Sequence, residues 1–139
     1  MAYYAFLDEN NIVTEVISGI DENTDGRNLE EEYGNFRGQT CKRTSFNTRF
    51  GKHWIDDPEN PGEKLLNPDQ SKSFRGNFAG VGYKYHADID MFVEPVIDES
   101  YESWVLNTLK GIYEPPIEYP DDGLSYTWEE ETQNWVVQP

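Results

Sequence analysis

Three stretches in the C-terminal part of the chain, YKYHADIDMFV (residues 83–93), WVLNTLKGIY (residues 104–113) and YTWEEETQNW (residues 126–135), are copies of one short pattern. In each copy an apolar, β-prone run is followed by polar turn-forming residues and then by a second apolar run, which indicates a β-hairpin. The offsets between copies are 21 and 22 residues. A proline follows each copy, at Pro95, Pro115 and Pro139. Because proline cannot donate to a strand ladder, each hairpin should end there.

Each copy holds two large apolar residues seven positions apart, one in each run. A large ring covers much apolar area, so one such pair can hold a thin hairpin together. We therefore predict an arm of three aromatic hairpins in residues 82–139, with the hairpins at 82–95, 103–116 and 125–139. The predicted clamp and interface residues are Tyr83, Tyr85, Phe92, Trp104, Leu106, Tyr113, Tyr126, Trp128 and Trp135. Hairpins this short are marginal alone, so they need neighbours.

Residues 1–81 are expected to form a small β-rich domain, so the predicted fold class is mainly β with one short helix. Two β-prone runs, residues 3–7 and 12–17, flank a four-residue polar turn and indicate a hairpin. Residues 40–50 indicate one or two more strands, with basic residues that keep an edge strand soluble. Residues 56–73 carry three prolines and almost no apolar periodicity, which predicts a loop.

A short helix is predicted between these strands. The residues expected to form its apolar face are Leu29, Tyr33 and Phe36, which lie at helical spacing. Acidic residues 30–32 in the first turn favour the helix dipole. Gly34 and Gly38 are expected to limit the length of the helix.

The segment DENTDG at residues 21–26, with Glu32 after it, matches the calcium-loop pattern D-x-N-x-D-G-x5-E. Its carboxylate and amide oxygens are of the kind that calcium prefers, and glycine permits the sharp turn. However, the preceding residues indicate a strand rather than a helix, and Asn28 stands where such loops carry an aliphatic residue. We therefore expect a polar turn that caps the following helix, and no metal site.

The net charge of −16 is distributed unevenly along the chain. Residues 1–36 carry −8, residues 37–84 carry +4 and residues 85–139 carry −12. Nucleic-acid binding needs a concentrated positive face, so this distribution argues against a nucleic-acid partner. Two interpretations stay open: the acidic regions serve solubility alone, or the basic middle and the acidic ends meet oppositely charged surfaces of neighbouring subunits.

The sequence favours a protein without catalytic activity or a cofactor. It has no G-x-S-x-G, no phosphate-binding glycine loop and no H-E-x-x-H, and its two histidines are 33 residues apart. Acid pairs such as Asp88 and Asp90 are typical of solvated turns rather than of glycosidases. The lone Cys41 excludes an internal disulfide and a cysteine zinc site, and we expect it to be a small buried residue.

We also expect a soluble protein without membrane contact. The chain shows no charged leader followed by an apolar run, and no apolar stretch approaches the length needed to cross a bilayer. Synthesis in a cytoplasm follows as an expectation.

Four stretches carry a resemblance to a known family: FLDENNIV (residues 6–13), TSFNT (44–48), RGNFAGVGYKY (75–85) and YPDDGLSYTWEEETQNW (119–135). Together they resemble a family of small proteins encoded by tailed phages of marine bacteria, cyanophages especially. The resemblance implies a virion or virion-associated protein, made in the cytoplasm of the host, and the family carries no catalytic motif.

Two functions from different classes remain. In the first, the protein is a structural accessory subunit that decorates or cements a phage capsid, or belongs to the tail. It would then bind capsid or tail subunits, or further copies of itself, by strand addition and aromatic anchors. In the second, it is a recognition module that stacks on host glycans. The rings expected to be exposed for that purpose are those of Trp104, Tyr113, Trp128 and Trp135.

Overall fold

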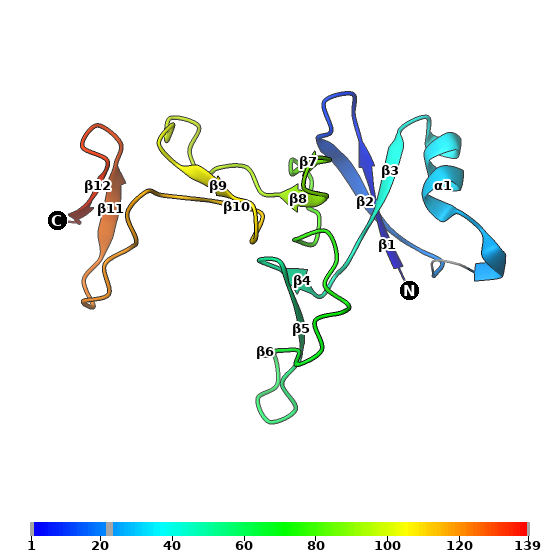
Figure 1. The fold of residues 1–139 in the computed structure, drawn as a ribbon, viewed down its shortest axis with the longest axis horizontal. Helices are drawn as coiled ribbons and strands as arrows, with labels where there is room; N and C mark the ends of the chain where they lie inside the picture. Colours follow the sequence, from blue (N-terminus) through cyan, green and yellow to red (C-terminus); the bar gives the residue numbers. More distant parts are fainter. Residues whose placement is uncertain (1, 22–23, 139) are drawn as a thin grey trace.

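The computed structural model describes residues 2–21 and 24–138. These residues hold twelve β-strands, one α-helix and one short 3-10 helix. The strands form five small antiparallel sheets, which confirms the predicted mainly β fold with one helix. In Figure 1 the helix lies at one end of an elongated molecule and the C-terminal hairpin lies at the other.

The N-terminal sheet has the strand order β2-β1-β3, formed by β1 (Ala2–Leu7), β2 (Val13–Gly19) and β3 (Thr40–Thr44). β1 pairs antiparallel with both neighbours, so the predicted N-terminal hairpin is confirmed and β3 is an edge strand. Central strand β1 is apolar throughout, as expected for a strand that is covered on both faces.

Two hydrophobic clusters cover the two faces of β1, because side chains alternate along a strand. The cluster on the helix side contains Tyr4, Phe6, Leu29 and Cys41. The cluster on the opposite side contains Ala5, Leu7, Val13, Ala79, Tyr85 and Phe92. The second cluster joins the N-terminal sheet to a hairpin more than seventy residues further along the chain.

Helix α1 (Leu29–Arg37) forms where it was predicted. The Asn28 side chain caps it by accepting from the Glu31 N–H, and Gly38 ends it in the left-handed conformation, at φ 74°. Gly34 lies inside the helix instead of limiting it. A Cβ there would lie 2.8 Å from the Gln39 carbonyl oxygen, so glycine allows the helix to pack closely on β3.

The predicted apolar face of α1 is wrong at Phe36. Leu29 is buried and the Tyr33 ring packs against Tyr4 at a centroid distance of 5.0 Å, but the Phe36 side chain is 92% exposed. The guanidinium of Arg37 lies 4.4 Å from the ring centroid of Phe6. Arg37 therefore covers the core at the last turn of α1, and Phe36 has no apolar surface to pack against.

A second sheet, with the order β4-β5-β6, projects from the row of hairpins in Figure 1. It consists of β4 (Thr48–Arg49), β5 (Lys52–Asp56) and β6 (Lys64–Leu66). The prediction of a continuous loop at residues 56–73 is therefore wrong, because β6 pairs with β5. The three residues of β6 are too few to show an alternating pattern, and nearby prolines obscure them.

The three C-terminal hairpins form as predicted. They are β7 (Lys84–His86) with β8 (Met91–Val93), β9 (Val105–Asn107) with β10 (Ile112–Glu114), and β11 (Tyr126–Glu129) with β12 (Asn134–Val137). Each has a four-residue turn whose last residue has a positive φ: 51° at Asp90, 68° at Gly111 and 49° at Gln133. Pro95 and Pro115 follow the first two hairpins, whereas Pro139 lies outside the described residues.

The first hairpin belongs to the N-terminal unit, so the domain boundary expected between residues 81 and 82 needs correction. Tyr85 and Phe92 are buried in the cluster against β1, and Val13 exchanges backbone hydrogen bonds with Tyr83 (2.8 Å) and Gly82 (2.9 Å). The first hairpin covers the face of the N-terminal sheet that is opposite α1. We therefore use the name outer arm for residues 96–138, which contain the second and third hairpins.

Candidate protein-interaction site

The structure places six of the nine predicted clamp residues directly opposite one another in pairs, whereas Tyr83 and Trp104 lie outside the paired strands and Tyr126 lies opposite Val137. The cross-strand partners are Tyr85 and Phe92, Leu106 and Tyr113, and Trp128 and Trp135. A spacing of seven residues yields this register because each turn has four residues. Such directly opposed pairs are the unit of stabilisation in antiparallel sheets.

Of the four rings expected to be exposed for glycan stacking, Trp128 is buried, so the expectation is wrong there, and the other three are only partly exposed. Trp128 is only 5% exposed, and Trp104, Tyr113 and Trp135 are half-buried. Glycan binding by stacking needs an accessible ring face. The structure instead turns these rings towards other parts of the chain.

Six aromatic rings join the third hairpin to the segments on either side of the second hairpin. The cluster contains Tyr101, Trp104, Tyr119, Tyr126, Trp128 and Trp135. Trp104 opens the second copy of the repeat, yet its ring contacts those of Trp128 (6.0 Å) and Trp135 (6.4 Å) in the third hairpin. Trp104 therefore links neighbouring copies instead of clamping its own.

Glu130 strengthens the same connection. Its carboxylate accepts hydrogen bonds from the Ser103 N–H (3.0 Å), the Ser103 hydroxyl (2.6 Å) and the Trp128 indole (3.0 Å). The hydrogen bonds from Ser103 and Trp128 lower the pKa of Glu130. The sequence predicted only that Glu130 belongs to the polar turn of the third hairpin, because nothing in the repeat shows that the linker before β9 returns to this turn.

Asn77 holds the first two hairpins against the rest of the protein, a role that the repeat pattern did not indicate. Its buried side-chain NH₂ donates to the carbonyl oxygens of Phe92 (2.9 Å), Lys110 (3.1 Å) and Gly111 (3.0 Å), and its side-chain oxygen accepts from the Phe50 N–H (2.9 Å). One amide therefore connects the β4–β5 turn, β8 and the turn of the second hairpin. The only sequence signal was the position of Asn77 within the glycine-rich stretch 76–82.

Arg75 forms a second junction between distant elements. Its guanidinium binds the carboxylates of Glu30 on α1 (2.7 Å) and Asp90 in the first hairpin turn (3.0 Å). Burial raises the pKa of Glu30, but hydrogen bonds from Arg75 and the Arg43 N–H outweigh it and leave the pKa lowered. Burial, together with a hydrogen bond to Asp90, raises the pKa of Tyr85 to about 12.

Apolar side chains remain exposed outside these junctions, in two groups. On the outer arm they are Ile97, Val105, Leu109, Ile117, Leu124, Val136 and Val137. On the projecting sheet and the segment before it they are Phe46, Phe50, Ile55, Leu65 and Leu66. Leu109, at the turn of the second hairpin, is 81% exposed. Exposed apolar side chains that form a contiguous patch mark contact with other molecules.

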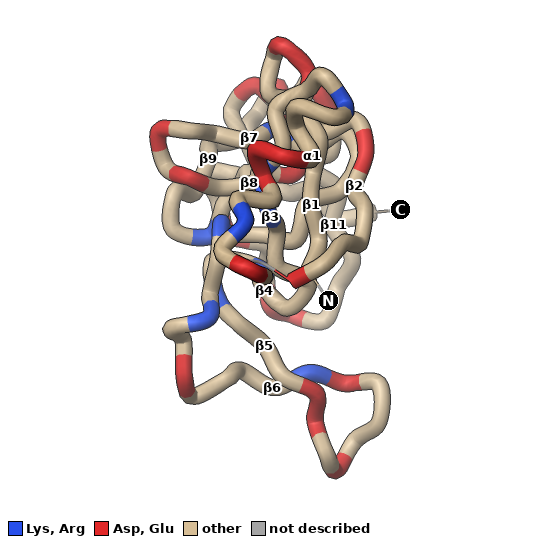
Figure 2. The backbone as a smooth tube through the Cα atoms, turned by 90° about the vertical axis from the view of Figure 1, so that its right-hand side faces the viewer, with Lys and Arg blue, Asp and Glu red and all other residues tan. Residues whose placement is uncertain are grey.

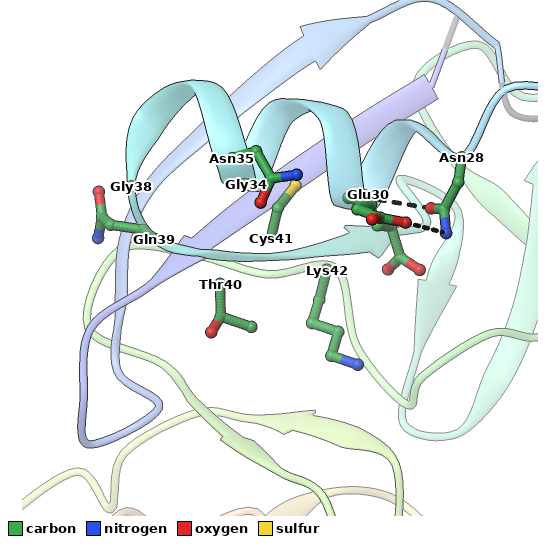
Figure 3. Close-up of a pocket in the computed structure, with 10 residues that line it drawn as sticks. Asn28, Glu30, Gly34, Asn35, Gly38, Gln39, Thr40, Cys41 and Lys42 are labelled. Atoms are coloured by element: carbon green, nitrogen blue, oxygen red, sulfur yellow. Dashed lines mark hydrogen bonds between the residues drawn. The ribbon is translucent and has the colours of Figure 1, made fainter.

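An open hollow of about 570 Å³ lies beside α1 and the edge strand β3 (Figure 3). Cys41 is buried at its side, as predicted, and burial raises the pKa of its thiol to about 12. A thiol with such a pKa stays protonated at neutral pH and is a poor nucleophile. Asn28, Asn35 and Thr40 also line the hollow, together with the charged side chains of Glu30 and Lys42.

The described residues contain no group of three or more His, Cys, Asp or Glu side chains placed to hold a metal ion. In the segment that resembles a calcium loop, Glu22 and Asn23 lie outside the described residues. Glu32, the last ligand of the pattern, binds Arg27 with distances of 3.0 Å to Nε and 2.9 Å to Nη2. In the part of the chain that the structure covers, no helix has the length and apolar character needed to span a bilayer.

Comparisons of this chain with protein-family models, curated proteins and solved structures find no match. The resemblance to small phage proteins therefore stays a prediction.

Proposed function

We propose that the protein is a non-enzymatic structural subunit that binds neighbouring subunits of a larger assembly through its outer arm. The resemblance noted in the sequence directs this proposal to the virion of a tailed phage, as a capsid decoration or cement protein or a tail component. The partners would be capsid or tail subunits or further copies of the chain.

The observation that carries the proposal is the exposure of apolar side chains on the second hairpin. Leu106 and Tyr113 face each other and are half-buried, whereas Val105 and Leu109 are 64% and 81% exposed. Since a hairpin of three-residue strands is marginal alone, a neighbour that covers these side chains adds the apolar burial that the unit lacks.

The elongated arrangement supports the same function. The second and third hairpins follow the N-terminal unit in a row, connected by proline-containing segments (Figure 1). Such a row can extend over more than one neighbouring subunit, while the N-terminal unit provides a folded base. In contrast, the packing of the tryptophans against one another offers no support for glycan stacking.

The test compares Leu109→Ser with Thr108→Ser, two changes in adjacent exposed residues of one turn. Both variants should keep the circular dichroism and melting temperature of the intact chain, since neither side chain is buried. Particles assembled with Leu109→Ser should retain less of the protein and lose resistance to heat and low salt, whereas Thr108→Ser should behave as the intact chain.

A shortened chain that ends at Pro116 gives an independent test, because it retains the N-terminal unit and the second hairpin. It should fold and bind particles more weakly than the intact protein. If both the shortened chain and Leu109→Ser left particle stability unchanged and abolished adsorption to host cells, the structural proposal would be wrong and host recognition would replace it.

A further inference from the structure

The projecting sheet carries a small cavity that the proposed function does not use. The cavity has a volume of about 210 Å³ and is lined by Phe46, Asn47, Arg49, Phe50, Trp54 and Lys64. Cavities of about 150 Å³ admit a molecule the size of benzene. This cavity can therefore receive one branched apolar side chain.

Two cations lie at the aromatic walls of the cavity. Arg49 lies 5.3 Å from the ring centroid of Phe50, and Lys64 lies 5.9 Å from that of Phe46. Lys64 is paired with Asp56 at 2.5 Å, but Arg49 has no ion pair with any described residue. The cavity thus combines an apolar interior with one cation available for a carboxylate. In Figure 2, Lys and Arg positions occur around β3 and β4, where the chain enters this sheet.

The backbone conformation at Phe50 is unfavourable for a bulky residue, which indicates that the Phe50 side chain is needed at this position. Phe50 and Gly51 form the turn between β4 and β5, with φ values of 55° and 73°. A turn with two positive φ values favours asparagine or glycine, and a bulky residue in this conformation costs conformational energy. Phe50 nevertheless stands at this position, 40% exposed and in the wall of the cavity.

The outer arm carries a segment with the complementary chemistry. Residues 117–124 hold exposed Leu124, at 54% exposure, close to three acidic residues, Glu118, Asp121 and Asp122. Asp122 is occupied by hydrogen bonds from the Leu124 N–H and the Tyr126 hydroxyl. Asp121 makes no ion pair or hydrogen bond through its carboxylate within the described ranges.

We propose that the cavity binds residues 117–124 of a second copy of this chain, with Leu124 in the cavity and Asp121 paired with Arg49. Figure 1 shows the projecting sheet and the third hairpin well apart within one chain, so the segment has to come from another copy. The net charges of the two regions are opposite: residues 37–84, which contain the cavity, carry +4, and residues 85–139, which contain the segment, carry −12.

This proposal rests on the proposed assembly function and adds one of its partners. The cavity and the segment are different surfaces, so the contact is head-to-tail and leaves each end free to bind another copy. The expected product is a ring or an open chain of subunits instead of a closed symmetric dimer. Screening by salt should weaken it, because one part of the contact is an ion pair near the surface.

Sedimentation velocity of the intact protein at low salt measures this association directly. The mass should rise with concentration, and about 1 M salt should reverse the rise. Arg49→Glu and Asp121→Arg should each weaken association about tenfold or more, and the double variant Arg49→Glu/Asp121→Arg, with the charges exchanged, should regain it. Lys52→Glu, a charge reversal in the adjoining strand but outside the cavity, is the matched control and should have a much smaller effect.

A mixing experiment tests the head-to-tail geometry. Arg49→Glu retains the acidic segment and Leu124→Ser retains the cavity, so the mixture should form a complex of one copy of each and stop there. Circular dichroism should be unchanged in both variants, because Arg49 and Leu124 are exposed.

A protein that stays monomeric up to about 1 mM at low salt would overturn the proposal. The proposal would also be overturned if Arg49→Glu and Leu124→Ser both associated as strongly as the intact chain. If such a monomer still stabilised particles and lost that effect on Leu109→Ser, the cavity proposal would fail while the proposed function stood.

Discussion

Trp128 and Trp135 lie directly opposite one another in the third hairpin, with ring centroids 5.2 Å apart and ring planes at 73°. An edge-to-face pair of this kind contributes more than its buried area alone. The pair is the centre of the six-ring cluster, and its loss should open the third hairpin without unfolding the N-terminal unit.

Trp128→Ala should therefore cost about 3–5 kcal/mol of local stability, because it removes a large buried ring. Hydrogen exchange across β11 and β12 measures this local opening. Val136→Ala is the control, since Val136 is 38% exposed and lies opposite Thr127 instead of Trp128. Equal exchange rates in both variants would show that the ring pair does not hold the hairpin.

Asn77→Ala should destabilise the protein by about 3 kcal/mol, since it leaves buried carbonyl groups and a backbone N–H without their partner. The midpoint and slope of urea unfolding report the loss. Asn10→Ala, in an exposed turn, should stay within about 0.5 kcal/mol of the intact chain. An Asn77→Ala variant as stable as that control would contradict the role of Asn77 as a junction.

Glu30 should make the protein sensitive to acid. Because its pKa in the folded protein is lowered from the ordinary value of 4.5, its contribution to stability is complete above that value and is lost as the pH falls through the folded pKa. Melting temperatures of Glu30→Gln and the intact chain should therefore differ at neutral pH and converge in acid. Glu9→Gln, at an exposed turn, should follow the intact protein throughout, and a constant difference for Glu30→Gln would contradict the linkage.

Cys41 should resist thiol reagents in the folded protein. Its pKa of about 12 and its burial leave little thiolate at pH 8. Labelling with a chromogenic disulfide should become fast only in denaturant. Fast labelling under native conditions would require the helix to leave β3.

Calcium should not bind at residues 21–32. Glu32 is already paired with Arg27, so a cation would have to displace the guanidinium. Calcium at about 1 mM should leave the melting temperature unchanged, since a ligand that binds only the folded state would raise it. A rise that disappears in Asp21→Ala would show that a site exists.

The local pattern of the chain was sufficient to predict the hairpins but not their partners. Alternation, turn residues and proline define each hairpin through neighbours in the sequence, so Tyr85 opposite Phe92 follows from spacing alone. Contacts between residues that are far apart in the sequence produce no such local pattern. Asn77 bonding to Gly111, and Trp104 packing on Trp128, depend on how linkers fold back.

The predicted arm illustrates the same limit. All three copies look alike in sequence, yet the first is buried against β1 while the second and third extend beyond it. The difference comes from Ala5 and Leu7, whose strand face needs a cover, and not from the hairpin itself. The cavity on the projecting sheet was missed because β6 is too short to be recognised by pattern.

The attachment of the hairpins in series has a mechanical consequence. A pull on the C-terminal end loads the aromatic cluster first, and Asn77 only after the third hairpin has separated from the second. Residues 115–138 could then span at most about 80 Å before the contact between Asn77 and the second hairpin bears the load. A protein built in this way can keep two bodies tethered while the distance between them changes.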